Sequence, residues 1–115
     1  MSAHKAVVER YIEGFRRSDH ALILSCLTDE IVWELHGQKT LRGKEAFDRE
    51  IENDEFESPL LTIDRLIEEG DTVVATGSGS VAKKGGDLLS FVFCEVFTFT
   101  DHAVSRLDTY HVWLG

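Results

Sequence analysis

The feature that most constrains this chain is the segment Ser90–Thr100, whose sequence is SFVFCEVFTFT. Side chains alternate between the two faces of a β-strand, so one face would carry four phenylalanines with Glu95 in the middle of the row. The other face would carry valines, a cysteine and threonines. A strand that is apolar on both faces is typical of the interior of a sheet. The segment therefore predicts a central strand and a sheet built around it.

Glu95 is the residue of this segment that points to chemistry. A carboxylate among phenylalanines is costly to ionise unless water, a cation or hydrogen bonds stabilise its charge. If this face lines a pocket, Glu95 is a candidate acid or base with a raised pKa. The alternatives are that Glu95 lies at a sheet rim, faces solvent or a dimer partner, or pairs with an arginine such as Arg42 or Arg106.

Length and charge limit the classes of protein to which the chain can belong. Its 115 residues predict a single domain, residues 1–115, with one hydrophobic core. The net charge of −9 argues against nucleic acid and anionic membranes as partners. No apolar run is long enough to span a membrane, and no signal-peptide pattern opens the chain. Cys26 and Cys94 match no metal-ligand spacing and are interpreted as buried thiols, so we expect a cytoplasmic protein without a metal.

Hydrophobic periodicity gives the expected order of elements. The expected helices span residues 4–17, 18–27 and 43–53. The expected strands span residues 31–36, 60–68, 72–82, 90–100 and 104–113, with a loop at 37–42. Gly77 and Gly79 interrupt one strand and are interpreted as marks of a bulge, of sheet curvature, or of room for a ligand or partner. The acidic segment 50–57 is interpreted as a solvated helix end and loop.

Helices followed by long antiparallel strands form an α+β arrangement. We expect a curved mixed or antiparallel sheet covered by three N-terminal helices. A bent sheet closed by helices makes a cone, and the inside of that cone is the expected ligand site.

Short motifs accompany the expected elements along the chain. They are Arg10–Glu13, Leu27–Glu30, Leu41–Phe47, Gly70–Val74 and Glu95–Phe99. Together they resemble the nuclear transport factor 2-like superfamily, specifically its ketosteroid isomerase-like and SnoaL-like polyketide cyclase branches. The resemblance covers nearly the whole chain and implies a single SnoaL-like domain with a cystatin-like α+β barrel fold.

The resemblance also implies roles for individual residues. Ketosteroid isomerases hydrogen-bond the developing oxyanion with a tyrosine on the first helix, which matches Tyr11. Their second donor is a protonated aspartic acid on a central strand, which matches Glu95, one methylene longer. Their aspartate base matches Leu35, which is apolar. The resemblance therefore implies that this chain lacks the base that steroid isomerisation by the usual route requires.

His111 is the candidate replacement for that base. In the resembled family the equivalents of Leu107, Thr109 and His111 point into the cavity. A histidine gains and loses protons near neutral pH. We therefore expect Tyr11, Glu95 and His111 to form a catalytic acid–base and oxyanion cluster. The alternatives are a tyrosine that only packs in the core and a histidine that is hydrogen-bonded for structural reasons.

The other side chains expected to bind a ligand are mostly apolar. They are Phe15, Trp33, Leu35, Phe91, Phe93, Phe97, Leu107 and Thr109. One interpretation is a cofactor-independent isomerase, cyclase or dehydratase that moves a proton on a hydrophobic carbonyl or enol. The other is a non-catalytic dimeric domain that binds a small hydrophobic ligand or serves as an accessory module. Leu35 favours the second interpretation, whereas Glu95 and His111 favour the first.

The second face of the last two strands predicts self-association. Both faces of these strands are apolar, and three short helices cannot cover both of them. We therefore expect a homodimer through this sheet face. The residues expected at the interface are Val92, Cys94, Val96, Tyr110 and Val112.

Overall fold

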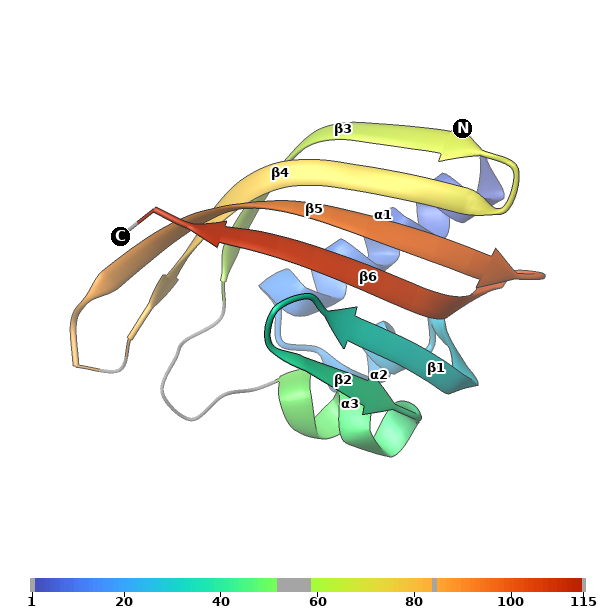
Figure 1. Ribbon diagram of the computed structural model, residues 1–115, viewed down its shortest axis with the longest axis horizontal. Coiled ribbons are helices and arrows are strands. Elements are labelled where there is room, and N and C mark those ends of the chain that lie inside the picture. Colours follow the sequence, from blue (N-terminus) through green and yellow to red (C-terminus); the bar gives the residue numbers. More distant parts are fainter. Residues whose placement is uncertain (1, 52–58, 84, 115) are drawn as a thin grey trace.

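Three helices precede most of a six-stranded sheet in a computed structural model of the protein, which describes residues 2–51, 59–83 and 85–114. The helices are α1 (Ala3–Arg16), α2 (His20–Leu24) and α3 (Lys44–Ile51). The strands are β1 (Leu27–Leu35), β2 (Lys39–Arg42), β3 (Leu60–Glu69), β4 (Thr72–Ala82), β5 (Leu88–Thr100) and β6 (Ala103–Trp113). The α+β class predicted from the sequence is confirmed (Figure 1).

The strands lie in the order β2-β1-β6-β5-β4-β3. The four long strands form an antiparallel meander, and β1 joins it by pairing in parallel with β6. The sheet is therefore mixed, and β5 has a partner on each side, as its two apolar faces predict. Figure 1 shows the sheet curving, with α1 behind it and its two edges apart.

Helix α1 is stabilised by a capping residue at its N-terminus and by the burial of an apolar stripe along one side. The Ser2 hydroxyl accepts a hydrogen bond from the Lys5 amide at 2.9 Å and caps the first turn. Val8, Tyr11 and Ile12 lie on one buried stripe that packs against the sheet. This stripe places Tyr11 on the inner side of the sheet. None of the helices in the described ranges is long and apolar enough to cross a membrane.

The predicted loop at 37–42 is wrong, because Lys39–Arg42 form strand β2. Gly37 has φ of +81°, and the Gln38 amide donates to the Leu35 carbonyl at 2.9 Å, which turns the chain back onto β1. A four-residue strand with one half-buried leucine carries too little periodicity to be recognised in the sequence.

Two other predicted boundaries also differ near β1. Helix α2 ends at Leu24 rather than Leu27, and β1 begins at Leu27 rather than Ile31. The Val104 amide donates to the Cys26 carbonyl at 2.9 Å, so pairing with β6 starts early. The register shifts between Leu27 and Val32. Helix α3 is described to Ile51, and the rest of the acidic segment lies outside the described residues.

Gly77 and Gly79 mark close packing within the sheet. A Cβ atom on Gly77 would lie 2.1 Å from the Thr62 carbonyl oxygen and 2.8 Å from the Phe93 ring. A Cβ atom on Gly79 would lie 2.7 Å from the Phe91 ring. The two phenylalanine rings of β5 therefore cover the glycines opposite them on β4. The space at these glycines holds this chain's own atoms.

Candidate functional site

Glu95 lies on β5 and faces the inside of the curved sheet. Ala75 of β4 and Thr109 of β6 are its neighbours across the two ladders. The residue is 8% exposed, and the phenylalanines of its row are buried as well. The alternative in which Glu95 lies at a solvent-facing rim therefore does not hold.

A chain of two hydrogen bonds ends at Glu95. The indole Nε1 of Trp33 donates to Thr109 Oγ1 at 2.8 Å, and Thr109 Oγ1 donates to Glu95 Oε2 at 2.8 Å. Trp33 is 6% and Thr109 2% exposed, so both bonds are shielded from water. Strand pairing creates the chain, because β6 lies between β1 and β5 and places Thr109 between the other two residues.

Burial raises the pKa of Glu95 to about 7, although the hydrogen bond from Thr109 opposes the rise. This carboxyl group therefore changes its charge near neutral pH. No ion pair reaches Glu95 in the described part of the chain. Arg106 pairs with Asp108 at 3.0 Å on the opposite face of β6, so it does not neutralise Glu95.

Tyr11 reaches the same region from α1. Its ring packs edge-on against Phe97 at 5.2 Å and Phe47 at 6.2 Å between centroids. Burial, and then the negative charges of Glu95 and Cys26, raise the pKa of Tyr11 well above its ordinary value. The hydroxyl group therefore keeps its proton. Within the described ranges no hydrogen bond joins Tyr11 to Glu95.

His111 lies one inward-facing position further along β6, opposite Phe93. Its half-buried ring is 4.9 Å from the Phe91 ring and 6.1 Å from the Trp113 ring. Burial lowers the pKa of His111, so the ring is neutral at pH 7. No hydrogen bond links His111 to Glu95 among the residues described. The structure thus brings Tyr11 and Glu95 together and places His111 in an adjoining aromatic cluster.

The other predicted ligand-binding residues fall into two groups. Phe97 and Leu107 are fully buried, and Leu35 lies in the same hydrophobic core, with Phe15 half-buried against it. Phe91 and Phe93 lie further along β5 in the aromatic cluster with His111. The core group surrounds the hydrogen-bonded chain, so apolar contacts shield Glu95 on that side.

Phe47 of α3 is a residue of this region that the sequence analysis did not assign. It is fully buried, and its ring stacks on Trp33 with centroids 4.3 Å apart. It also contacts the ring of Tyr11. Its place on the apolar side of the third predicted helix was the available signal. That signal does not say which strand the helix covers.

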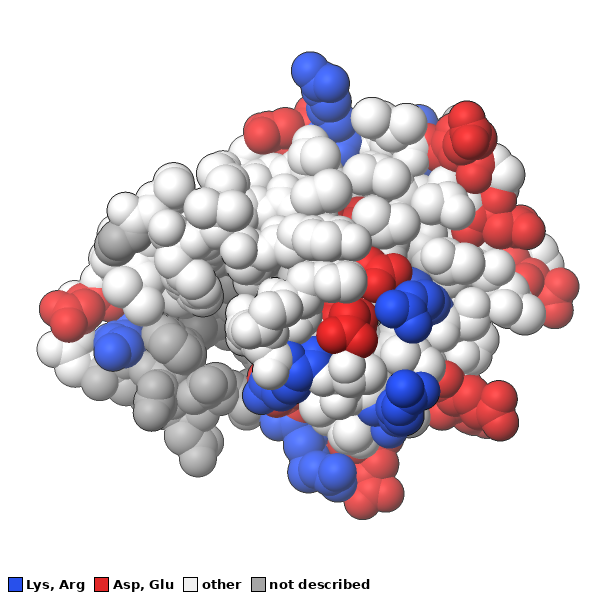
Figure 2. Space-filling view, in the orientation of Figure 1, with Lys and Arg blue, Asp and Glu red and all other residues white. Residues whose placement is uncertain are grey.

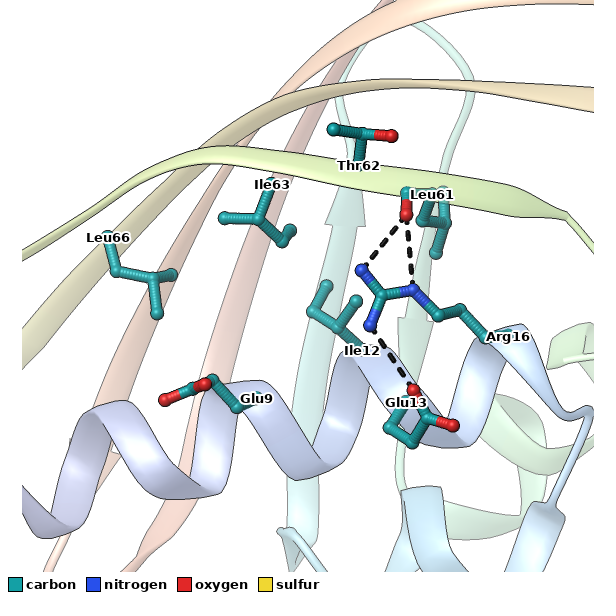
Figure 3. Close-up of a pocket in the computed structure, with 8 residues that line it drawn as sticks. All are labelled: Glu9, Ile12, Glu13, Arg16, Leu61, Thr62, Ile63 and Leu66. Atoms are coloured by element: carbon teal, nitrogen blue, oxygen red, sulfur yellow. Dashed lines mark hydrogen bonds and ion pairs between the residues drawn. The ribbon is translucent and has the colours of Figure 1, made fainter.

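A groove of about 510 Å³ lies elsewhere, between α1 and β3 (Figure 3). Ile12, Ile63 and Leu66 form its apolar wall. Arg16 crosses one end, where its guanidinium donates to the Leu61 carbonyl at 2.9 and 3.1 Å. None of the residues proposed for catalysis lines this groove. In the described ranges no group of three or more metal-ligating side chains could hold a metal ion.

Residues 8–107 match the SnoaL-like domain family. The chain belongs to this family. The predicted resemblance to the SnoaL-like branch is thereby confirmed. No curated protein matches the chain.

Solved structures show the same fold at low identity. An NTF2-like protein of unknown function from Burkholderia pseudomallei is 20% identical, with a TM-score of 0.89 over 97% of this chain and 92% of that one. TerC co-crystallised with polyporic acid is 22% identical, with a TM-score of 0.86 over 96% and 92%. An LEH-like epoxide hydrolase from M. tuberculosis is 19% identical, with a TM-score of 0.83 over 96% and 82%.

Proposed function

We propose that this protein binds a small hydrophobic molecule at Glu95 and moves a proton on a carbonyl or enol group of that molecule. The observation that carries the proposal is the buried carboxyl group of Glu95, whose pKa is about 7 and whose side chain is held by the Trp33–Thr109 hydrogen bonds. A carboxyl group with such a pKa is present in both charge states near neutral pH.

The two charge states supply the two halves of a proton shuttle. Ionised Glu95 takes a proton from a hydroxyl group or from a carbon beside a carbonyl, and neutral Glu95 returns one. Tyr11 keeps its proton and would donate a hydrogen bond to the developing oxyanion. Isomerisation, aldol-type cyclisation and dehydration all use these steps, and none of them requires a cofactor.

The family and its neighbours support a small-molecule role. The chain matches the SnoaL-like domain, and one protein of the same fold was crystallised with polyporic acid. Another is described as an LEH-like epoxide hydrolase. We transfer from them only the idea that this fold accommodates an organic ligand.

Leu35 favours a second candidate, a non-catalytic ligand-binding or accessory domain. In the resembled isomerases the aspartate base takes this place, whereas Leu35 is buried in the apolar core. Among the described residues no hydrogen bond joins His111 to Glu95, so His111 does not pair with Glu95 in the place of that base. In this alternative Glu95 and Tyr11 recognise the ligand's oxygen but no bond to hydrogen breaks.

Side-chain NMR of Glu95 and His111 tests the proposal. Both groups would be titrated with and without a panel of hydrophobic enols and phenols. We expect a Glu95 pKa near 7 that moves when a ligand binds, and loss of binding or turnover in Glu95→Gln but not in the exposed control Glu30→Gln. Binding without turnover favours the accessory domain. A Glu95 signal that no ligand of the panel shifts contradicts both candidates.

We also propose a cytoplasmic homodimer that forms through the outer face of β5 and β6. Val92, Tyr110 and Val112 are exposed there, Val112 by 58%. Figure 2 shows an uncharged surface over β4, β5 and the C-terminal end of β6, with a group of charged side chains over the middle of β6. Because each chain carries a net charge of −9, two copies repel least where their surfaces are uncharged.

A further inference from the structure

The two carboxylate oxygens of Glu95 have different surroundings. Oε2 accepts the hydrogen bond from Thr109 at 2.8 Å. Oε1 receives no hydrogen bond from the described residues, and this atom is not completely buried. Oε1 is therefore the oxygen without a hydrogen bond from the described part of the chain, in a residue that as a whole is buried.

Trp33 fixes the direction of the hydrogen bond at Oε2. An indole N–H can only donate, so Thr109 Oγ1 must accept from Trp33 at 2.8 Å. The single hydroxyl hydrogen of Thr109 is then directed to Glu95 Oε2. When Glu95 is neutral, its own proton consequently lies on Oε1.

We infer that Thr109 is a positioning residue that leaves only Oε1 of Glu95 without a hydrogen bond from the described residues, so that the site selects ligands with a single hydroxyl or carbonyl group over amidinium ligands. Either ligand group needs only one oxygen of Glu95. An ionised Glu95 accepts a hydrogen bond from a hydroxyl group at that oxygen, and a neutral Glu95 donates one from it to a carbonyl group. An amidinium or guanidinium group binds best when both oxygens of a carboxylate accept its parallel N–H bonds. The hydrogen bond from Thr109 uses one lone pair of Oε2 and therefore competes with such a two-point contact.

This inference rests on the proposed function, because it requires a ligand to reach Glu95. It adds to that function a rule for ligand selection. It also predicts a property of the protein without ligand, so the two ideas can fail separately.

The first test uses the protein without ligand. Thr109→Val removes the hydroxyl group while nearly keeping the side-chain volume, and Thr109→Ser keeps the hydroxyl group. Side-chain NMR should show the pKa of Glu95 rising in Thr109→Val, because the bond that favours the ionised form is lost, and returning toward the wild-type value in Thr109→Ser. Trp33→Phe, which releases the Thr109 hydroxyl group, should shift the pKa in the same direction by less. An unchanged pKa in Thr109→Val or, if that variant does not fold, in Trp33→Phe overturns the inference.

The second test compares two ligands with the same apolar body, 2-naphthol and 2-naphthamidine, by calorimetric titration at pH 8. Wild type and Thr109→Ser should prefer the naphthol. Thr109→Val should shift the ratio of the two dissociation constants at least tenfold toward the amidine, because the hydrogen bond that competes for Oε2 is removed. If the naphthol binds and the ratio does not depend on Thr109, the inference is overturned and the proposed function stands. If neither ligand binds any variant and neither one shifts the NMR signal of Glu95, ligand binding at Glu95 is overturned. The proposed selection between ligands then fails with it.

Discussion

Replacing Glu95 by glutamine tests whether this carboxyl group is as costly to ionise as its surroundings indicate. The glutamine side chain has the same shape, and its amide oxygen can accept the Thr109 hydrogen bond. It cannot ionise. The pH dependence that Glu95 gives to stability should therefore disappear in the variant.

The magnitude follows from the two pKa values. Burial moves the pKa of Glu95 from an ordinary 4.5 to about 7, which corresponds to about 3 kcal/mol. Because the folded state holds this proton more tightly, the contribution is fully present below pH 4.5 and is lost as the pH rises to 7. The wild-type protein should thus lose stability across this window relative to Glu95→Gln. Between pH 5.5 and pH 8, which avoids the isoelectric region near 4.9, the change in this difference is about 2 kcal/mol.

Urea unfolding followed by circular dichroism, at half-unit steps from pH 5.5 to pH 8, measures this difference. Other titrating groups contribute equally to both proteins and cancel, and Tyr11 keeps its proton throughout. Glu30→Gln, at an exposed position, is the matched control and should show no comparable trend. A difference between wild type and Glu95→Gln that stays constant within about 0.5 kcal/mol would refute the argument, since a desolvated carboxyl group must produce the slope.

Three further predictions concern packing and assembly. Gly77→Ala should lower the free energy of unfolding by about 3 kcal/mol, because the backbone must move to admit the Cβ atom, whereas Ser78→Ala should change it little; equal urea midpoints would contradict this. Phe47→Ala should cost about 3–5 kcal/mol in the same assay by leaving a cavity beside Trp33, and wild-type stability would show that this packing is not needed. Wild type should scatter light as a dimer and Val112→Lys as a monomer with unchanged circular dichroism; a wild-type monomer removes the proposed interface.

The sequence predicted the long strands and α1 because their signals are local. Alternation in Ser90–Thr100 identifies a buried row of side chains, and it also identifies Glu95 as the polar member of that row. The stripe with Tyr11 places that residue on the inner side of α1 for the same reason. Short elements such as β2 carry no such signal, because their pairing depends on a turn and a neighbouring strand.

The partners of Glu95 could not be predicted in this way. Trp33 and Thr109 are 76 residues apart and meet because β1 pairs in parallel with β6 in one particular register. A shift of that register by one residue would turn Thr109 to the other face and break the chain of hydrogen bonds. For the same reason, the sequence could place His111 on the right face but not at the right distance from Glu95.

The sequence by itself determined the run of long antiparallel strands, the side of each long strand that is buried, and the presence of a carboxyl group among aromatic rings. These depend on periodicity, which each segment carries alone. The tertiary structure decided that Glu95 is held by Thr109 and Trp33, that no arginine among the described residues neutralises it, and that Tyr11 rather than His111 lies beside it. These depend on strand register and helix packing, which arise only when distant segments meet.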